Sequence, residues 1–197
     1  MRSTSSMLGR RLARWGVIAS MLAFATPAAA QTGGASTPGS EPTSGTTTPT
    51  SYPTVPGNRA KLTKKGKAIP PANAPANIQN AIWAANAIRK LPYRYGGGHA
   101  SFHDSGYDCS GAVSYVLYAA GLLSSPMPSG SFMNWASPGK GSWITVFANR
   151  GHMYAKVAGL RWDTSAFGER RFRGKGPRWR QSKRKPKGFA VRHIEGY

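Results

Sequence analysis

The sequence feature that most constrains the fold is an apolar repeat just after Cys109, the only cysteine of the 197 residues. Its members are spaced as on one face of an α-helix: Val113, Val116, Leu117 and Ala120. Asp108 precedes the repeat as an expected N-cap, and Gly121 follows it as an expected helix end. The pattern therefore predicts a helix that buries one face and carries Cys109 in its first turn.

The start of a helix favours the reactive form of a cysteine. Unpaired amide N–H groups and the positive end of the helix dipole stabilise a thiolate, which is the nucleophile. Most lone cysteines are instead small buried apolar side chains without chemistry. Polar, glycine-rich neighbours and an expected export signal favour a nucleophilic role for Cys109.

The first 75 residues are expected to lie outside the folded domain. Residues 1–30 have the form of a signal peptide: an arginine-rich start, a short apolar centre and Ala28-Ala29-Ala30 as a cleavage site. Residues 31–75 are rich in Thr, Ser, Pro and Gly and then basic, and they are expected to form a disordered tether. We therefore expect a secreted or envelope-associated protein, with an uncleaved membrane anchor as the alternative.

Residues 76–197 are long enough to form one domain with its own core. A second amphipathic helix is predicted from the spacing of Ile78, Ile82, Ala85 and Ile88. Strands are predicted in the later part of the chain, at 143–147, 152–158, 160–164 and 188–193. Helices followed by antiparallel strands indicate an α+β fold.

The formal net charge is +21, and much of it lies near the C-terminus. Two basic runs, Arg170–Lys175 and Arg178–Lys187, are interleaved with Phe172 and Trp179, as on a nucleic-acid surface. A solvated basic loop is also compatible with this pattern. For an exported protein, attraction to anionic polymers of the cell envelope is favoured, and no specific nucleic-acid partner is predicted.

A cysteine nucleophile needs a base and a group that orients this base. His152 opens a predicted strand and shares a face with Tyr154. An even-length hairpin loop centred on Ala158-Gly159 pairs Tyr154 with Asp163, which places Asp163 on the face of His152. His152 is therefore the expected base and Asp163 the expected orienting acid. The alternative for Asp163 is a salt bridge with a neighbouring cation, Lys156 or Arg161.

Three motifs resemble those of the NlpC-type cell-wall peptidases, and the resemblance covers roughly residues 78–197. They are Tyr93-Arg-Tyr95-Gly96-Gly97, Asp108-Cys109-Ser110-Gly111 and Gly151-His152. The resemblance implies a papain-like fold, in which the helix that bears the nucleophile packs on an antiparallel sheet. The spacer between Gly97 and Cys109 is longer than is usual in that family.

The resemblance also implies an activity and several residue roles. Cys109 and His152 match the nucleophile and the base, and Tyr93 matches a tyrosine that assists the Cys109 N–H at the oxyanion. Asp108 and Ser110 are expected to bind substrate. The implied reaction is hydrolysis of peptide bonds in peptidoglycan stem peptides, beside γ-linked D-glutamate, through a thioester. The resemblance implies a monomer that needs neither cofactor nor metal.

Three other interpretations stay open at the level of the sequence. One is a non-catalytic wall-binding module of the same fold, and another is an extracellular nucleic-acid binder. The third is a zinc site, because suitable ligand types are close in sequence: His99, His103, Asp104, Asp108 and Cys109.

Overall fold

The computed structural model describes residues 52–165 and 175–197, which belong to one compact unit that begins at Thr48. The expected signal peptide at 1–30, the first part of the expected tether at 31–51 and Arg170–Arg173 of the basic runs lie outside the described residues. Within the described part of the chain, no helix has the length and apolar character needed to cross a bilayer.

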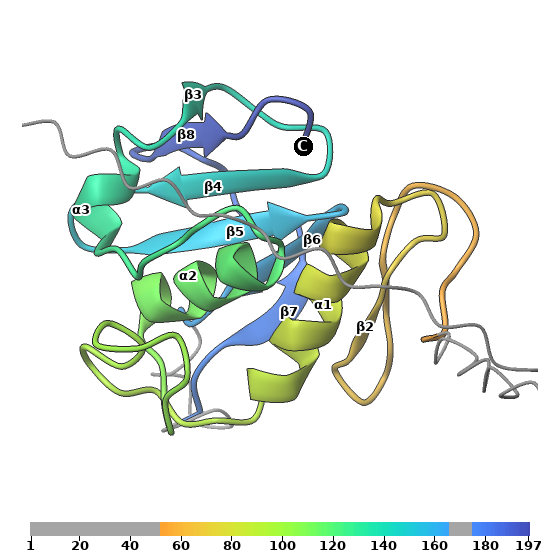
Figure 1. The fold of residues 1–197 in the computed structure, drawn as a ribbon, viewed down its shortest axis with the longest axis horizontal. Helices are drawn as coiled ribbons and strands as arrows, with labels where there is room; N and C mark the ends of the chain where they lie inside the picture. Colours follow the sequence, from red (N-terminus) through yellow and green to blue (C-terminus); the bar gives the residue numbers. More distant parts are fainter. Residues whose placement is uncertain (1–51, 166–174) are drawn as a thin grey trace, which may run out of the picture. The chain divides into compact units, whose positions relative to one another are not determined.

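The main sheet has six antiparallel strands in the order β3-β8-β4-β5-β6-β7 (Figure 1). The strands predicted from the sequence are present as β4 (Ile144–Ala148), β5 (Met153–Val157), β6 (Leu160–Asp163) and β8 (Ala190–His193). Two edge strands were not predicted, β3 (Ser137–Pro138) and β7 (Arg178–Gln181). The last strand of the chain, β8, pairs with both β3 and β4.

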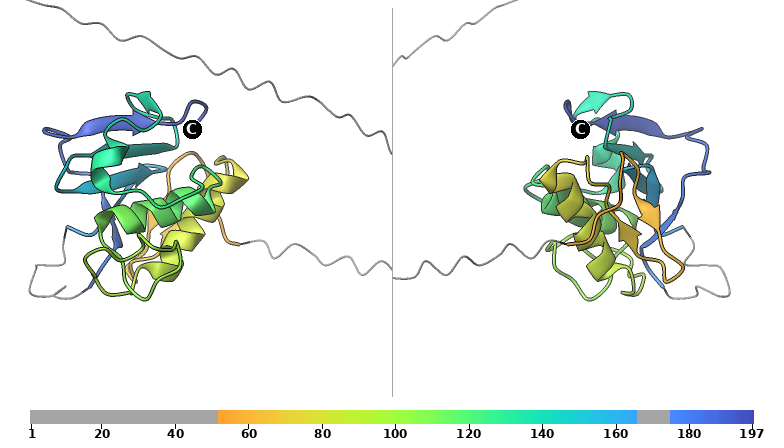
Figure 2. Two further views of the ribbon diagram at one scale, coloured as in Figure 1. Left: turned by 60° about the vertical axis from the view of Figure 1, so that its left-hand side comes forward. Right: turned by 90° about the vertical axis from the view of Figure 1, so that its right-hand side faces the viewer.

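Two longer helices lie beside each other in front of this sheet (Figures 1 and 2). They are α1 (Ala76–Ile88) and α2 (Cys109–Ala119), and α2 packs against β5 and β6. A short helix, α3 (Ser129–Phe132), lies between α2 and β3 and contacts β4. The α+β fold is confirmed, as is the placement of a helix bearing Cys109 on an antiparallel sheet.

The apolar repeat after Cys109 forms the buried face of α2. All four members are at most 3 % exposed: Val113, Val116, Leu117 and Ala120. The helix ends as the sequence predicts, because Gly121 has a φ of 68° and the Leu122 N–H donates to the Leu117 carbonyl over 2.8 Å. On the sheet side, Trp162 Nε1 donates to the Ala112 carbonyl over 3.0 Å and joins the two layers.

Residues 52–75 correct one expectation, since they are part of the fold rather than of a disordered tether. They include the hairpin of β1 (Lys61–Leu62) and β2 (Ala68–Ile69), which contacts α1 and β7. The buried Asn86 amide pairs with both backbone groups of Ala68, over 2.9 and 2.7 Å, and Trp179 Nε1 donates to the same Asn86 oxygen. This segment has few large apolar side chains, so its sequence gives no strong signal of order. Its order depends instead on polar partners that are distant in the sequence.

Candidate active site

Cys109 and His152, from two layers of the fold, line one pocket, and the buried Asp163 contacts His152. Cys109 comes from the first turn of α2, His152 from the residue before β5, and Asp163 from the end of β6. The pocket has a volume of about 280 Å³. It is lined by Tyr93, Cys109, Gly151, His152, Thr164, Ser165 and Arg184.

Cys109 is held at the start of α2 by its neighbours. Asp108 is the N-cap, as predicted, and its Oδ1 accepts from the Gly111 N–H over 2.9 Å. The Cys109 N–H belongs to the first turn, whose amides have no carbonyl partner within the helix. The side chain is partly buried and in contact with the apolar core. Cys109 thus lies at a helix terminus and at the edge of a pocket.

His152 is fixed by the turn that joins β4 and β5. The Asn149 side-chain oxygen accepts from the N–H groups of Gly151 and His152, over 3.0 and 2.8 Å. The Asn149 N–H in turn donates to the His152 carbonyl over 2.9 Å. These bonds fix the His152 backbone, and the ring has both Asp163 and Cys109 as hydrogen-bonding neighbours.

Asp163 lies where strand parity predicts it. Ala158 and Gly159, with φ of 44° and 85°, form the tight turn, and Ala155 pairs with Trp162. This register places Tyr154 opposite Asp163, whose Oδ1 lies 3.0 Å from His152 Nε2. Because Nε2 is engaged with Asp163, Nδ1 is the ring nitrogen that remains for Cys109.

Asp163 also takes part in the salt bridge that was the alternative prediction. Its Oδ2 lies 3.2 Å from Arg161 Nε and 3.2 Å from Arg184 Nη1, while its Oδ1 also accepts from the Ser165 N–H. The Arg161 contact is an ion pair without hydrogen-bond geometry at Nε. The carboxylate is fully buried, and both of its oxygens are engaged.

The electrostatics of the site favour a charged histidine. Burial by itself lowers the pKa of His152, but hydrogen bonds with Asp163 and Cys109 outweigh it and raise the pKa from 6.5 to about 9. Burial likewise opposes ionisation of Asp163, yet the bonds from His152 and from the Ser165 N–H keep the pKa of Asp163 below its usual value. His152 is therefore charged at neutral pH, and Cys109 is one of its neighbours.

Tyr93 lies in the same pocket, as expected for an oxyanion residue. A backbone bridge with Tyr107 places it next to the Asp108–Cys109 segment. Burial, and then the charges of Cys109 and Asp108, raise the pKa of Tyr93 above 10.0. Its hydroxyl therefore remains protonated at neutral pH and able to donate a hydrogen bond.

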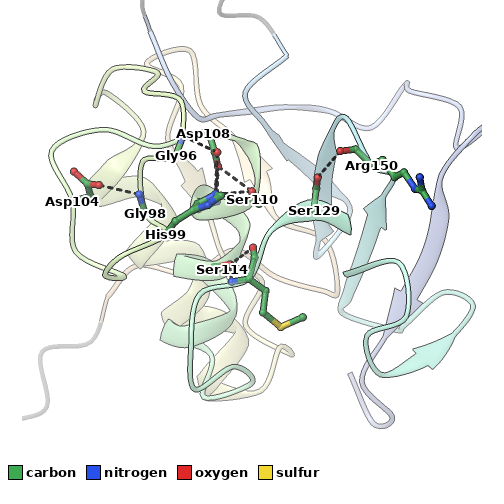
Figure 3. Close-up of polar contacts among 11 residues, drawn as sticks. Gly96, Gly98, His99, Asp104, Asp108, Ser110, Ser114, Ser129 and Arg150 are labelled. Atoms are coloured by element: carbon green, nitrogen blue, oxygen red, sulfur yellow. Dashed lines mark hydrogen bonds and ion pairs between the residues drawn. The ribbon is translucent and has the colours of Figure 1, made fainter. Parts of the chain in front are cut away.

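Asp108 and Ser110, expected to bind substrate, are engaged within the protein and do not line the pocket. His99 Nε2 lies 2.9 Å from Asp108 Oδ2 and 2.9 Å from Ser110 Oγ (Figure 3). The second Asp108 oxygen accepts from the Ser110 hydroxyl and the Gly111 N–H. Their expected role in substrate binding stays a prediction.

The longer spacer between Gly97 and Cys109 forms a loop closed by Asp104. Asp104 Oδ2 accepts from the Gly98 N–H over 2.9 Å, and Arg94 pairs with its Oδ1 over 3.2 Å. His103 is exposed, with its ring edge against Tyr115. Among the described residues, no three His, Cys, Asp or Glu side chains are grouped to hold a metal ion, so the zinc interpretation finds no support there.

Arg184 is the site residue that the sequence did not single out. It lines the pocket, pairs with Asp163 and lies over the rings of Tyr154 and Phe189, at 5.1 and 5.0 Å from their centroids. In the sequence it is one cation among many in a basic run. No local sequence pattern distinguishes Arg184 from the other cations of this run. Its position depends on the path of the chain between β7 and β8.

The chain matches no protein-family model and no curated protein. Solved structures that it resembles include the peptidoglycan hydrolase RipB from Mycobacterium tuberculosis, with 26% identity and a TM-score of 0.48 over 66% of this chain and 70% of that one. Another is the P60 domain of an antigen from Mycobacterium avium subspecies paratuberculosis, with 24% identity and a TM-score of 0.45 over 60% of this chain and 96% of that one.

Proposed function

We propose that this protein is a cysteine peptidase that acts outside the cytoplasm and hydrolyses peptide bonds in peptidoglycan stem peptides. The observation that carries the proposal is the chain of contacts from Cys109 through His152 to Asp163 at a pocket. The substrate class rests on the resemblance of the Asp108–Gly111 and Tyr93–Gly97 motifs to those of the NlpC-type peptidases. Export rests on the signal-like pattern of residues 1–30.

The proposed reaction begins with the Cys109 thiolate and the His152 imidazolium. The thiolate attacks the scissile carbonyl carbon, and the negative charge moves to the carbonyl oxygen. The Cys109 N–H and the Tyr93 hydroxyl are the proposed donors that stabilise this oxyanion, and Tyr93 lines the same pocket as Cys109. Asp163 keeps the imidazolium oriented, as the acid does in other nucleophile–base–acid triads.

The second half of the reaction uses the same imidazole twice. His152 donates its proton to the leaving amine, the C–N bond breaks, and a thioester with Cys109 remains. The neutral imidazole then takes a proton from a water molecule that attacks the thioester. The acid product leaves, and the thiolate–imidazolium pair is restored. No step draws on a cofactor.

The test is digestion of purified peptidoglycan, followed by mass spectrometry of the released peptides. The wild-type protein is expected to release new peptide termini, and Cys109→Ala is expected to release none. His152→Ala is expected to lose activity by at least about a hundredfold, because acid–base catalysis contributes roughly 10²–10⁴-fold. His103→Ala removes an exposed histidine and is expected to retain activity.

A second readout separates an inactive enzyme from a binding module. Iodoacetamide is expected to alkylate Cys109 rapidly near pH 6 in the wild type and slowly in His152→Ala, because the imidazolium supports the thiolate. If Cys109→Ala cleaves at the wild-type rate, the proposal is wrong. If the thiol is unreactive and the protein only sediments with peptidoglycan, the protein is a wall-binding module.

A further inference from the structure

A groove away from the candidate active site gathers positive charge. It has a volume of about 600 Å³ and is formed by the β1–β2 turn, the end of α1 and the residues around the start of β7. Six cations line this basic groove: Lys64, Lys65, Arg89, Lys90, Lys175 and Arg178. None of them lines the pocket that contains Cys109.

No carboxylate of the described residues lines the basic groove. The four described acids have other partners: Asp104 binds Arg94, Asp108 caps α2, Asp163 binds His152, and Glu195 accepts from Ser137. Five of the six cations, all except Arg178, form no ion pair with a described acid: Lys64, Lys65, Arg89, Lys90 and Lys175. Like charges held in one concave surface focus a positive potential, which attracts anions from solution.

The groove is built on fixed elements rather than on a loose loop. Arg89 Nη1 donates to the Asn86 carbonyl over 2.6 Å, and Arg178 Nη2 donates to the Gly176 carbonyl over 3.0 Å. Between them, the buried Trp179 ring joins the hairpin and α1 through Asn86. The lysines project from this frame as exposed side chains.

The groove continues along β7, which favours a chain-like ligand over a single ion. A second hollow of about 410 Å³ shares Arg178 and Trp179 with the first. It adds Arg180 and Lys183, and also Arg161, whose charge is shared with Asp163. A flexible polyanion that follows β7 can meet both sets of cations, whereas an isolated anion can occupy only one.

The lining also indicates how such a chain is recognised. Trp179 is only 4 % exposed, and the exposed large apolar residues of the described chain, Tyr52, Tyr95 and Tyr118, lie outside the groove. Proteins that bind single-stranded nucleic acids typically stack the bases on exposed aromatic rings, and the groove has none. Four of the six cations are lysines, which bind phosphate as point charges rather than as a planar fork.

We propose that the basic groove binds a linear, base-free polymer of phosphodiesters or phosphates. This site lies beyond the proposed catalytic function and does not depend on it. The sequence placed the expected contact with anionic envelope polymers in the C-terminal basic runs, whereas the proposed site is the basic groove. Only Lys175 and Arg178 belong to the C-terminal basic runs, and the other four cations come from residues 64–65 and 89–90.

The probe is linear inorganic polyphosphate of defined length, titrated into the full chain at several salt concentrations. Tight binding that weakens steeply with salt is expected, with orthophosphate a poor competitor. The triple variant Lys64→Gln/Lys65→Gln/Lys90→Gln is expected to bind at least about tenfold more weakly. Its slope of log K against log salt is expected to fall by about two, because each contact with a single-stranded polyanion contributes about 0.7.

Two matched variants separate the groove from net charge. Lys140→Gln/Lys185→Gln/Lys187→Gln removes the same charge from exposed lysines outside the groove and is expected to bind nearly as the wild type does. Lys64→Arg/Lys65→Arg/Lys90→Arg keeps the charge and is expected to retain binding. Equal rates of Cys109 alkylation in all variants show that the fold is intact.

Three results overturn the proposal. If both glutamine triples weaken binding equally, the attraction comes from net charge and not from the groove. If oligo(dT) of matched charge binds more tightly than polyphosphate, the bases contribute and the surface is a nucleic-acid site. If the wild type binds no polyphosphate at low salt, the groove does not bind such polymers.

Discussion

Asp163 divides its carboxylate between His152 on one oxygen and two arginines on the other. The two arginines stabilise the ionised form, and the ionised form raises the pKa of His152 to about 9. In the proposed mechanism the protonated imidazole of His152 donates its proton to the leaving nitrogen, which then departs as a neutral amine. Activity should therefore fall as the pH rises through the pKa of His152.

The pH–rate profile tests this link. For the wild type, kcat/KM is expected to decline near pH 9, where His152 loses its proton. In Asp163→Asn the hydrogen bond and the negative charge that raise the pKa of His152 are altered or lost, so the decline is expected to move to lower pH. The rate itself is expected to drop by at least about a hundredfold.

Glu195→Gln is the control for a changed carboxylate, since Glu195 is exposed and accepts a hydrogen bond from the Ser137 hydroxyl, away from the pocket of Cys109. It is expected to keep both the rate and the position of the alkaline decline. An unchanged decline in Asp163→Asn would show that Asp163 does not set the protonation of His152.

The first turn of α2 depends on a close approach between two glycine segments. A Cβ on Gly111 would lie 2.0 Å from the Gly97 carbonyl oxygen and 2.9 Å from the Gly98 Cα. These neighbours are backbone atoms, which cannot move aside as a flexible side chain can. The glycines thus allow the Gly96–Gly98 loop to pack on the helix turn that carries Cys109.

Gly111→Ala is expected to lower the free energy of unfolding by about 2 kcal/mol or more, because overpacking a fixed backbone costs roughly 1–3 kcal/mol. It is also expected to slow alkylation of Cys109, since the first turn of α2 must shift. Urea unfolding and iodoacetamide kinetics measure the two effects.

Gly130→Ala is the matched control, because Gly130 is also helical and has open space at the Cβ position. It is expected to leave stability within about 0.5 kcal/mol of the wild type. Equal effects of the two substitutions would contradict the role given to the close contact at Gly111.

The elements that the sequence predicts are those with a strong local pattern. Both long helices follow from apolar spacing, and β4, β5, β6 and β8 follow from apolar runs between turn residues. Strand β7 has only Trp179 as a buried apolar residue between arginines, so it becomes a strand through its pairing with β6. The hairpin of β1 and β2 depends on Asn86, which no local pattern connects to it.

The same distinction applies to the candidate site. The position of Cys109 at a helix start and the contact of His152 with Asp163 could be predicted, because helix caps and strand parity are local rules, whereas the pairing of Cys109 with His152 was expected from the resemblance of their motifs. The approach of Arg184 could not, because it depends on a return of the chain across the sheet. The engagement of Asp108 and Ser110 with His99 also escaped prediction, since it depends on the path of a loop.

At the scale of the whole molecule, the described part of the N-terminal segment belongs to the folding unit. Removing residues 1–75 deletes the two hydrogen bonds between Asn86 and the Ala68 backbone and uncovers the apolar side chains that the hairpin buries. A chain of residues 76–197 is therefore expected to be less stable than one of residues 52–197 by roughly 3 kcal/mol or more, because each hydrogen bond contributes about 1 kcal/mol and apolar burial is also lost.

Urea unfolding of the two truncated chains measures this difference, with the full chain as reference. The 52–197 chain is expected to unfold at nearly the same urea concentration as the full chain. If the 76–197 chain does so too, residues 52–75 are dispensable for stability, and the folded domain begins where the sequence alone placed it.

The placement of Cys109 on a helix and of His152 and Asp163 on the sheet has a consequence for how the protein can be monitored. The special reactivity expected of the thiol requires the two layers to be docked, because neither layer holds the pair alone. A chain in which α2 has separated from β5 and β6 keeps its sulfur but loses the neighbouring imidazole. The rate at which a small electrophile labels this thiol therefore measures the fraction of molecules in which α2 is packed on the sheet. The measurement needs no substrate and little protein.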